Sequence, residues 1–501
     1  MGKPLPSLEK PTLDKDLDKV TFAEEASHHV LKPWAGLGLG LIFVLSSMLF
    51  AAAYISEQPA FLMIIAAAAL AGYMAMNIGA NDVTNNVGAA VGSKAITMTT
   101  ALVIAAIFEI AGAVFAGGRV VSTIGGGIIN TAVMPTGEVY AWVMMAALLS
   151  AAVWINIATW SGAPISTTHS IIGGILGAGI AAAGVSAVHW WSLAGIAASW
   201  MVSPLLGGGI AAALLAFIKI FITYRDDRIT RAVFWMPILI AAMTGAFTAY
   251  FSVIGLENVI HLNLSTGIYI GLAVALATLL ITRPWIRRQA KGLEDRNQSL
   301  RKLFKAPLIL SAALLSFAHG ANDVSNVVGP LSAIVASVNG LAVSDTTAVP
   351  LWEILIGALG ISCGILLFGP KLIRVVGQEI TKLNPMRAFC VALATATTVL
   401  IATALGLPVS TTHTAVGAVF GIGFFREWFT RNSKLRLEYV RRKTGQTDFQ
   451  RLIEESPDER HRRQLVRRSH FMTIIAAWVI TVPASALLSA GVYVLFAAIF
   501  I

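Results

Sequence analysis

The stretch NIGANDVTNNVGAAVGS, residues 77–93, places one aspartate and four asparagines directly behind an alanine-rich apolar run. A second stretch, AHGANDVSNVVGPLSAI at 318–334, repeats it, with Gly79–Val83 recurring as Gly320–Val324. A polar motif that recurs at this length within one chain indicates internal duplication. The surroundings of the two copies decide what kind of fold contains them.

Those surroundings are strongly apolar. The chain has 501 residues, of which 56% are hydrophobic and 12% charged, against roughly 25% charged residues in an ordinary soluble domain. Apolar runs recur from Ala35 to the C-terminus, and about 20 helical residues suffice to cross a bilayer core. Spanning runs form helices because lipid offers no hydrogen bonds to the backbone. We predict an all-α polytopic membrane protein with about 10–12 transmembrane segments, some interrupted or re-entrant.

The net charge of +10 is concentrated in loops between apolar runs. Arg283–Lys305 holds eight basic and two acidic residues, and 426–468 holds thirteen basic and seven acidic residues. Cytoplasmic loops of membrane proteins carry such an excess of Lys and Arg. The charge therefore places these loops in the cytoplasm and is no sign of a nucleic-acid partner.

A second duplicated motif follows the first. APISTTHSIIGGILGAG at 163–179 matches LPVSTTHTAVGAVFGIG at 407–423. Asp82 precedes His169 by 87 residues, and the corresponding separation in the second half is 90. Repeated halves with interrupted apolar segments are typical of secondary transporters, whose site lies between the repeats near the bilayer midplane. The sequence leaves open whether the two homologous repeats are inverted.

These features divide the chain into six predicted regions. They are a polar N-terminal extension (1–33), a first transmembrane repeat (34–222), a linker hairpin with basic cytoplasmic loops (223–306), a second repeat (307–425), a charged cytoplasmic loop (426–470) and a final transmembrane helix (471–501).

The first motif has the chemistry of a cation site. A carboxylate in the hydrocarbon region costs at least ~2.5 kcal/mol, so Asp82 and Asp323 should face a cavity or a cation. The glycine before each aspartate permits an interrupted helix, and Asn85 and Asn326 offer neutral oxygen ligands. Such oxygens suit Na⁺, or a proton carried on the carboxylate. The alternative is a polar helix-to-helix contact without a ligand.

The second motif has the chemistry of an oxyanion site. Proline followed by Ser, Thr, Thr and His begins a helix, because hydroxyl side chains cap its free N–H groups. The N-terminus of a half-helix attracts an anion through those donors and its dipole. The candidate ligands are the hydroxyls of Ser166, Thr167, Thr168, Ser410, Thr411 and Thr412. The alternative is helix capping alone.

Both motifs together predict a cation-coupled anion symporter, because the carboxylates would repel an anion unless a cation or proton lay between them. His169 and His413 could donate to the anion, relay a proton or orient their neighbours. Glu109 is a further candidate for the ion site, and Glu353 is a weaker one. We expect no enzyme activity and no resident cofactor, and a GxxxxGK nucleotide loop is missing from the sequence.

The paired GANDV and STTH motifs resemble the inorganic phosphate transporter family. The resemblance covers about 60–500 and implies uptake of phosphate with Na⁺ or H⁺, through inverted halves in the plasma (inner) membrane, often as a dimer. It further implies that Asn81, Asp82, Asn322 and Asp323 serve the cation and phosphate centre, and that the STT hydroxyls bind phosphate. The family's usual alanine after NDV is Thr84 here and Ser325 in the second copy, and Asn86 adds an amide.

Two alternatives to a phosphate symporter stay open. One branch of the same family resembles sulfate permeases, so another tetrahedral oxyanion could be the substrate. A different class is an anion channel, or a sensor that binds phosphate without moving it.

Overall fold

The computed structural model describes residues 35–55, 60–161, 165–257, 259–341, 349–379, 383–444 and 468–501. Within these ranges the chain is helical, apart from turns and one isolated backbone bridge between Ile129 and Val188. The predicted all-α class is confirmed. The predicted polar extension 1–33 lies outside the described residues, as does the part of the charged loop from 445 to 467.

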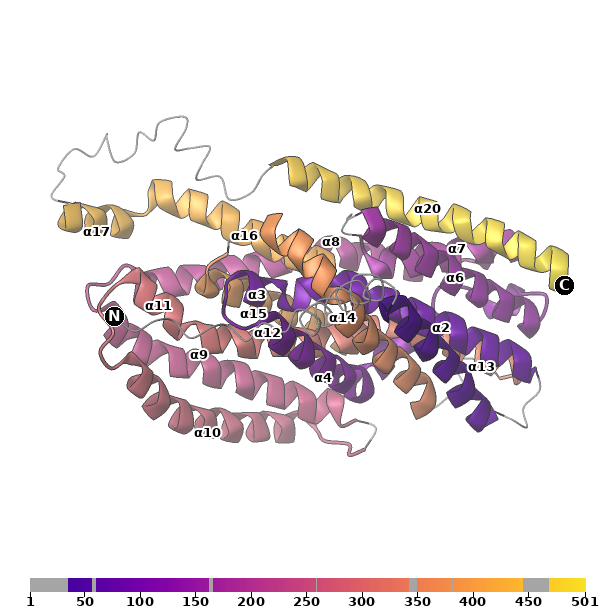
Figure 1. The fold of residues 1–501 in the computed structure, drawn as a ribbon, viewed down its shortest axis with the longest axis horizontal. Helices are drawn as coiled ribbons and strands as arrows, with labels where there is room; N and C mark the ends of the chain where they lie inside the picture. The colour runs from indigo at the N-terminus through magenta and orange to yellow at the C-terminus, as the bar shows by residue number, and fades with distance from the viewer. Residues whose placement is uncertain are drawn as a thin grey trace, which may run out of the picture.

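The helices lie alongside one another, most of them along the long axis of the molecule (Figure 1). Within the described ranges, ten helices are long and apolar enough to cross a membrane, or eleven if the bent pair Asn297–Leu303 and Lys305–Val338 is one span. This number agrees with the predicted 10–12 segments. After an N-terminal helix, Ala35–Ile55, the main helices are α2 (Phe61–Val83), α4 (Met98–Ala116), α5 (Gly118–Gly126), α6 (Gly137–Ser161), α7 (Thr167–Ala183), α8 (Trp190–Ile218), α9 (Arg228–Tyr250), α10 (Leu264–Ala290), α11 (Asn297–Leu303), α12 (Lys305–Asp323), α13 (Ser325–Val338), α14 (Leu351–Glu379), α15 (Pro385–Ala404), α16 (Thr411–Asn432), α17 (Lys434–Thr444) and α20 (Arg468–Phe500).

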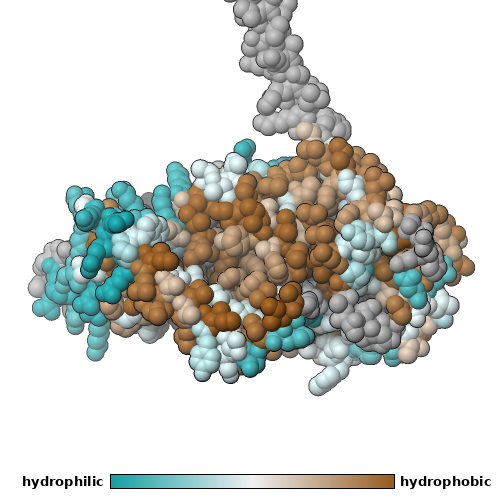
Figure 2. All heavy atoms as spheres, turned by 90° about the horizontal axis from the view of Figure 1, so that it is seen from below, coloured by the Kyte–Doolittle hydropathy of each residue, from teal (hydrophilic) through white to brown (hydrophobic). Residues whose placement is uncertain are grey.

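The surface matches a membrane environment. In Figure 2 hydrophobic residues cover the middle of the molecule, and hydrophilic residues gather at its left end. In Figure 1 α11 and α17 lie at that end. Arg442 of α17 pairs there with Asp226 at 2.9 Å. The segments around 226, 297–303 and 434–444 are parts of the basic loops that the sequence assigns to the cytoplasm.

The GANDV motif of the first half continues α2 and does not interrupt it. The helix runs to Val83, and its hydrogen bonding changes to a π-helix over Thr84–Gly88, after the aspartate. Gly79 lies against α14, where an added Cβ would lie 1.9 Å from the carbonyl oxygen of Ile361. The prediction of an interruption at the glycine is therefore wrong, because Gly79 provides a close helix-to-helix approach.

The second copy is built in the same way. α12 continues through Gly320 to Asp323, and the break at Val324 again follows the aspartate. A Cβ on Gly320 would lie 2.2 Å from the carbonyl oxygen of Glu109 in α4. Each copy thus packs on a helix of the other half: α2 on α14 and α12 on α4.

The STTH motifs open two further helices. Ser166 caps α7 by accepting the backbone N–H of His169 at 3.2 Å, and Ser410 caps α16 through His413 at the same distance. The predicted helix starts are thus confirmed. α7 has 17 residues, which is at the lower limit for crossing a bilayer. It packs on α6 and α20, and α16 packs on α15 and α8.

Candidate functional site

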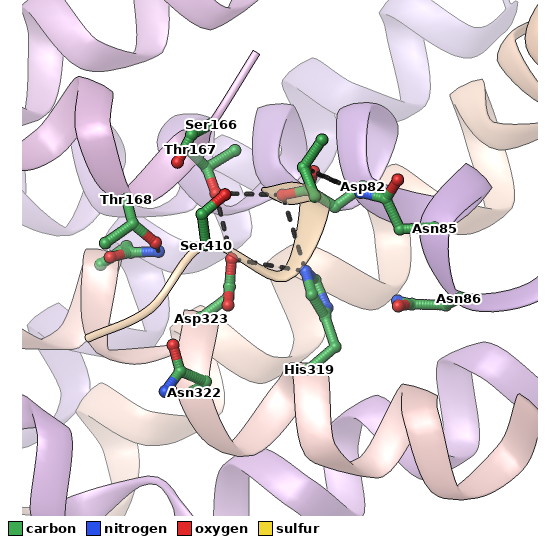
Figure 3. Close-up of polar contacts among 12 residues, drawn as sticks. Asp82, Asn85, Asn86, Ser166, Thr167, Thr168, His319, Asn322, Asp323 and Ser410 are labelled. Carbon is green, nitrogen blue, oxygen red and sulfur yellow. Dashed lines mark hydrogen bonds and ion pairs between the residues drawn. The ribbon is translucent and has the colours of Figure 1, made fainter. Parts of the chain in front are cut away.

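The two motif aspartates meet inside the protein. The Thr167 hydroxyl oxygen lies 3.0 Å from Oδ2 of Asp82 and 3.0 Å from Oδ2 of Asp323 (Figure 3). Both aspartates are 0% exposed. A hydroxyl has a single hydrogen, so Thr167 can donate to only one of these two oxygens at a time. The other oxygen needs a different donor or a cation.

The aspartate of the first half also receives donors from the second half. The Thr412 hydroxyl lies 2.9 Å from Asp82 Oδ1, and Asn85 Nδ2 donates to the same oxygen at 3.1 Å. Asn85 also reaches Thr412 Oγ1 at 2.8 Å. In the other direction, Asn326 donates to the Thr168 hydroxyl at 3.3 Å. The Asn85 and Asn326 amides therefore each contact the STT segment of the opposite half.

A histidine completes the aspartate pair. His319 Nε2 lies 3.6 Å from Asp82 Oδ2 and 3.5 Å from Asp323 Oδ2 (Figure 3). Its other ring nitrogen lies 2.6 Å from Glu109 Oε1, which also accepts a hydrogen bond from Asn86 at 2.6 Å. The imidazole therefore connects the predicted candidate Glu109 to both aspartates.

The charge of this cluster is unbalanced. Three carboxylates, those of Asp82, Asp323 and Glu109, surround the single imidazole of His319, and all four side chains are fully buried. Among the described residues, His319 is the ion-pair partner found for these carboxylates. Ligand atoms of Asp82, His319 and Asp323 all lie within 4.8 Å of one another. Because burying uncompensated carboxylates is costly, the cluster requires bound protons or a cation.

The motif asparagines Asn81 and Asn322 hold the segments before α7 and α16. Asn322 donates to the Thr403 hydroxyl at 3.0 Å and accepts the backbone N–H of Val409 at 3.3 Å. Asn81 makes the matching contact with the Thr159 hydroxyl at 3.1 Å. With its amide turned over, Asn81 would accept from Thr159 and donate to Asp82 Oδ1 at 3.2 Å. We favour this second orientation because it gives the carboxylate another donor.

The predicted oxyanion ligands lie at the same place. The N-termini of α7 and α16 approach each other, and Thr168 donates to the carbonyl oxygen of Val409 at 3.2 Å. Thr411 is 1% exposed, and its hydroxyl has no hydrogen-bond partner among the described residues. The STT segments of both halves therefore converge next to the carboxylates.

The two motif histidines pack against each other. The rings of His169 and His413 are 4.5 Å apart between centroids, and His169 lies 3.8 Å from the ring of Trp200. Both histidines are buried. These contacts suit the orienting role among the three roles that the sequence left open.

Comparison with known proteins fits this arrangement. A sequence model described as the phosphate transporter family matches residues 78–489, which include both copies of each motif. The chain belongs to the phosphate transporter family. A Helicobacter pylori protein named "Putative phosphate permease" is 42% identical over 96% of this chain and 98% of its own length. A Pyrococcus abyssi protein with the same description is 38% identical over 70% of this chain and 86% of its own length.

A solved structure is similar as well. "The sodium-dependent phosphate transporter" matches with a TM-score of 0.75 and 33% identity, covering 88% of this chain and all of that one. Membership of the phosphate transporter family and ten apolar helices identify a multi-pass membrane protein. The expected class of transporter, as opposed to enzyme, agrees with the family.

Sequence reasoning missed His319, although the second copy of the motif contains it. An ionisable residue in an apolar span, four positions before Asp323, lies on the same face of a helix as that aspartate. That spacing was the available signal. Thr159 and Thr403 were missed too, yet both follow Ile-Ala at the same distance before their STTH motif.

The structure also places the acidic candidates. Gly320 lies on Glu109 of α4, and the matching Gly79 lies on Ile361 of α14. The residue that corresponds to Glu109 in the other half is therefore the apolar Ile361. Glu353 lies eight residues before Ile361, in the first turn of α14, about 12 Å along the helix axis. Glu353 is thus no counterpart of Glu109.

Proposed function

We propose that this member of the phosphate transporter family is a symporter that imports inorganic phosphate with Na⁺ across the plasma (inner) membrane by alternating access. The observation that carries the proposal is the single Thr167 hydroxyl between two buried carboxylate oxygens, 3.0 Å from each. That hydrogen reaches only one of the two oxygens at a time, and Asp323 Oδ1 has no hydrogen-bond partner among the described residues. A cation next to Asp82 and Asp323 would satisfy it.

The phosphate would bind where the N-termini of α7 and α16 converge. The serine cap of each helix satisfies one N–H group of the first turn, and the others lack an intrahelical acceptor. These N–H groups, the helix dipoles and the hydroxyls of Ser166–Thr168 and Ser410–Thr412 favour an oxyanion. The phosphate would then lie beside Asp82 and Asp323, and it would be repelled unless a cation were bound as well. Coupling follows from this repulsion.

Alternating access is supported by contacts that correspond between the halves. Asn85 contacts Thr412 and Asn326 contacts Thr168, so each pair joins one half to the other. Gly79 and Gly320 likewise each pack on a helix of the opposite half. We propose that the halves are inverted repeats that rock against each other around the shared site, as in other transporters of this type.

Na⁺ is proposed ahead of H⁺ for two reasons. The solved structure that resembles this chain is described as sodium-dependent. The central site also offers hydroxyl and carboxylate oxygens, which are ligands for a hard cation. H⁺ coupling through the same carboxylates is the alternative.

Uptake by purified protein in proteoliposomes tests the proposal. An inward Na⁺ gradient without a pH gradient should drive accumulation of labelled phosphate above its equilibrium level. A pH gradient without Na⁺ should not. Accumulation driven only by the pH gradient would replace Na⁺ by H⁺, and equilibration without accumulation would indicate a channel.

Sulfate is the second candidate substrate, since a helix N-terminus binds either tetrahedral oxyanion. Unlabelled sulfate should compete poorly with labelled phosphate in the same vesicles. If sulfate competed better than phosphate and was itself accumulated, the substrate would be sulfate. Tight phosphate binding without uptake under any gradient would instead indicate a sensor.

A further inference from the structure

A second strongly charged feature lies far from the central site. A cavity of about 420 Å³ opens between α8, α11, α15 and α16. It lies toward the end of the molecule where Figure 1 shows α11 and α17. We call it the basic cavity. Its cationic lining residues are Lys219, Arg301, Arg387, Arg426, Arg431 and Arg436, and Glu427 is its carboxylate.

The basic cavity is separate from the aspartate cluster. α16 begins at Thr411 beside the cluster and reaches the cavity at Arg426, 15 residues later. At 1.5 Å per residue the two sites are about 22 Å apart along this helix. The cations of the cavity therefore play no part in binding at Asp82 and Asp323.

The described lining of the cavity contains one carboxylate for its six cations. Arg431 pairs with Glu427 at 3.0 Å, which uses the cavity's carboxylate. Arg436 donates to the backbone carbonyl oxygen of Thr430 at 2.8 Å, which is a neutral partner. The remaining cations converge on one space in a family member whose substrate is itself an anion.

Lys219 is the most informative of them. Its side chain is 7% exposed, and its ammonium lies 4.4 Å from the ring centre of Phe429 and 5.3 Å from that of Phe425. Among the residues that the structure describes, no hydrogen bond or ion pair is found for this ammonium. Keeping a buried cation beside other cations is unfavourable without an anion. A bound anion would therefore stabilise this part of the cavity.

The start of α15 gives independent support. Asn384 caps this 20-residue helix, and its first turn contains Arg387 and no acidic residue. A cation at a helix N-terminus is unfavourable because that end carries partial positive charge. Asn384 and Arg387 both line the cavity, so an anion there would gain from both the dipole and the guanidinium.

We propose that the basic cavity binds a ligand carrying two or more phosphate groups. Its volume lies in the range of ligand pockets, roughly 300–1,000 Å³, and its several cations exceed what one phosphate needs. Guanidinium groups bind phosphate oxygens in pairs, and a buried lysine adds a point charge. The ligand is either a soluble polyphosphate or the headgroup of a lipid with two phosphates, since basic pockets between helices at the cytoplasmic side suit both.

Calorimetric titration of the full-length protein in phosphatidylcholine nanodiscs tests this proposal. In Na⁺-free buffer, which keeps the coupled central site from binding orthophosphate, potassium tripolyphosphate should bind about tenfold more tightly than orthophosphate at equal ionic strength, because it can form additional charged hydrogen bonds. The double substitution Lys219→Gln with Arg387→Gln should weaken tripolyphosphate binding about tenfold or more. Binding no tighter than that of orthophosphate, or equal binding to wild type and variant, overturns the proposal.

The matched control removes two charges from the same end of the molecule. Arg287→Gln with Arg288→Gln changes two exposed residues in the last turn of α10, outside the cavity. Its binding should stay within about twofold of wild type, since exposed charges are screened by salt. An equal loss in this control would show non-specific attraction and overturn the proposal.

A second pair covers the case in which the Lys219 variant does not fold. Arg301→Gln with Arg426→Gln removes two other lining cations and should weaken binding to a similar extent. Unchanged binding in this pair, in protein that is folded by circular dichroism, also counts against the proposal.

Two further titrations define the ligand and its independence. If cardiolipin in the nanodisc prevents tripolyphosphate from binding, the ligand is the lipid headgroup; if binding persists, the ligand is soluble. Asp323→Asn should still bind tripolyphosphate in full. Because the titration measures binding without transport, failure of the symport proposal would leave this result unaffected.

Discussion

The two copies of the GANDV motif are nearly identical in sequence but differ in what surrounds them. In both copies the asparagine after the aspartate contacts the STT segment of the other half, and in both the glycine packs on a helix of the other half. The partner of Gly320 is Glu109, however, and the partner of Gly79 is Ile361. His319 of the second copy has Ile78 as its counterpart in the first.

This difference separates two kinds of residue. The duplicated residues build a framework to which both halves contribute, as expected of a site that opens alternately to the two sides. His319, Glu109 and Asn86 occur once and form a connected buried chain beside that framework. We infer that the duplicated residues bind and move the ions. The residues that occur once set the charge around Asp82 and Asp323.

The largest expected effect comes from removing the charge of either duplicated carboxylate. Asp82→Asn or Asp323→Asn should each lower Na⁺-driven phosphate accumulation by about 100-fold or more, because one charge of the cation site is lost. Both variants should still reach the membrane, since an amide is close in shape to a carboxylate. Wild-type uptake by either variant would contradict a shared cation site.

Substitutions of the residues that occur once, His319 and Glu109, should have smaller effects on uptake. Glu109→Gln should weaken the apparent Na⁺ affinity by about tenfold, the effect of losing one buried charged hydrogen bond, whereas His319→Gln should not weaken it, because the imidazole competes with the cation for the same carboxylates. The phosphate KM at saturating Na⁺ should change less. Uptake measured over a range of Na⁺ concentrations checks this.

Glu353→Gln is the matched control for that pair, because it removes a buried carboxylate of a transmembrane helix outside the cluster. Its Na⁺ dependence should match that of wild type. An effect as large as that of Glu109→Gln would show that any buried carboxylate matters equally.

Part of this site can be predicted from the amino-acid sequence, and the reason is the duplication. Asp82, Asp323 and the STT residues occur twice, so aligning the two halves of the chain is enough to identify them. The helical class follows from the apolar runs, because lipid forces the backbone to hydrogen-bond internally.

Residues that occur once give no such signal. His319 approaches Glu109 only because α12 packs on α4, and those residues are 210 positions apart. The role of Gly79 was wrongly predicted for a related reason. A glycine in a helix is compatible with either a break or a close helix contact, and only the position of α14 decides between them.

The close helix contacts at Gly79 and Gly320 can be tested by the stability of the protein. Gly79→Ala and Gly320→Ala should each destabilise the protein by about 1–3 kcal/mol, the usual cost of overpacking, because the new Cβ would lie 1.9 Å or 2.2 Å from a backbone oxygen. Thermal unfolding in detergent measures this. Gly209→Ala is the control, since nothing lies within 4 Å of its added Cβ, and it should unfold like wild type.

The smallest expected effects separate two threonines that occupy the same position in the two halves. Thr412 donates to Asp82 directly, whereas Thr168 donates to a backbone carbonyl oxygen and accepts from Asn326. Thr412→Val should therefore weaken Na⁺-dependent uptake by about tenfold, the value of one hydrogen bond to a charged group. Thr168→Val should weaken it by only about three- to fivefold, as for a neutral hydrogen bond. Equal losses in the same uptake assay would mean that, during transport, Thr168 reaches Asp323 as Thr412 reaches Asp82, and the cation site would then be symmetric.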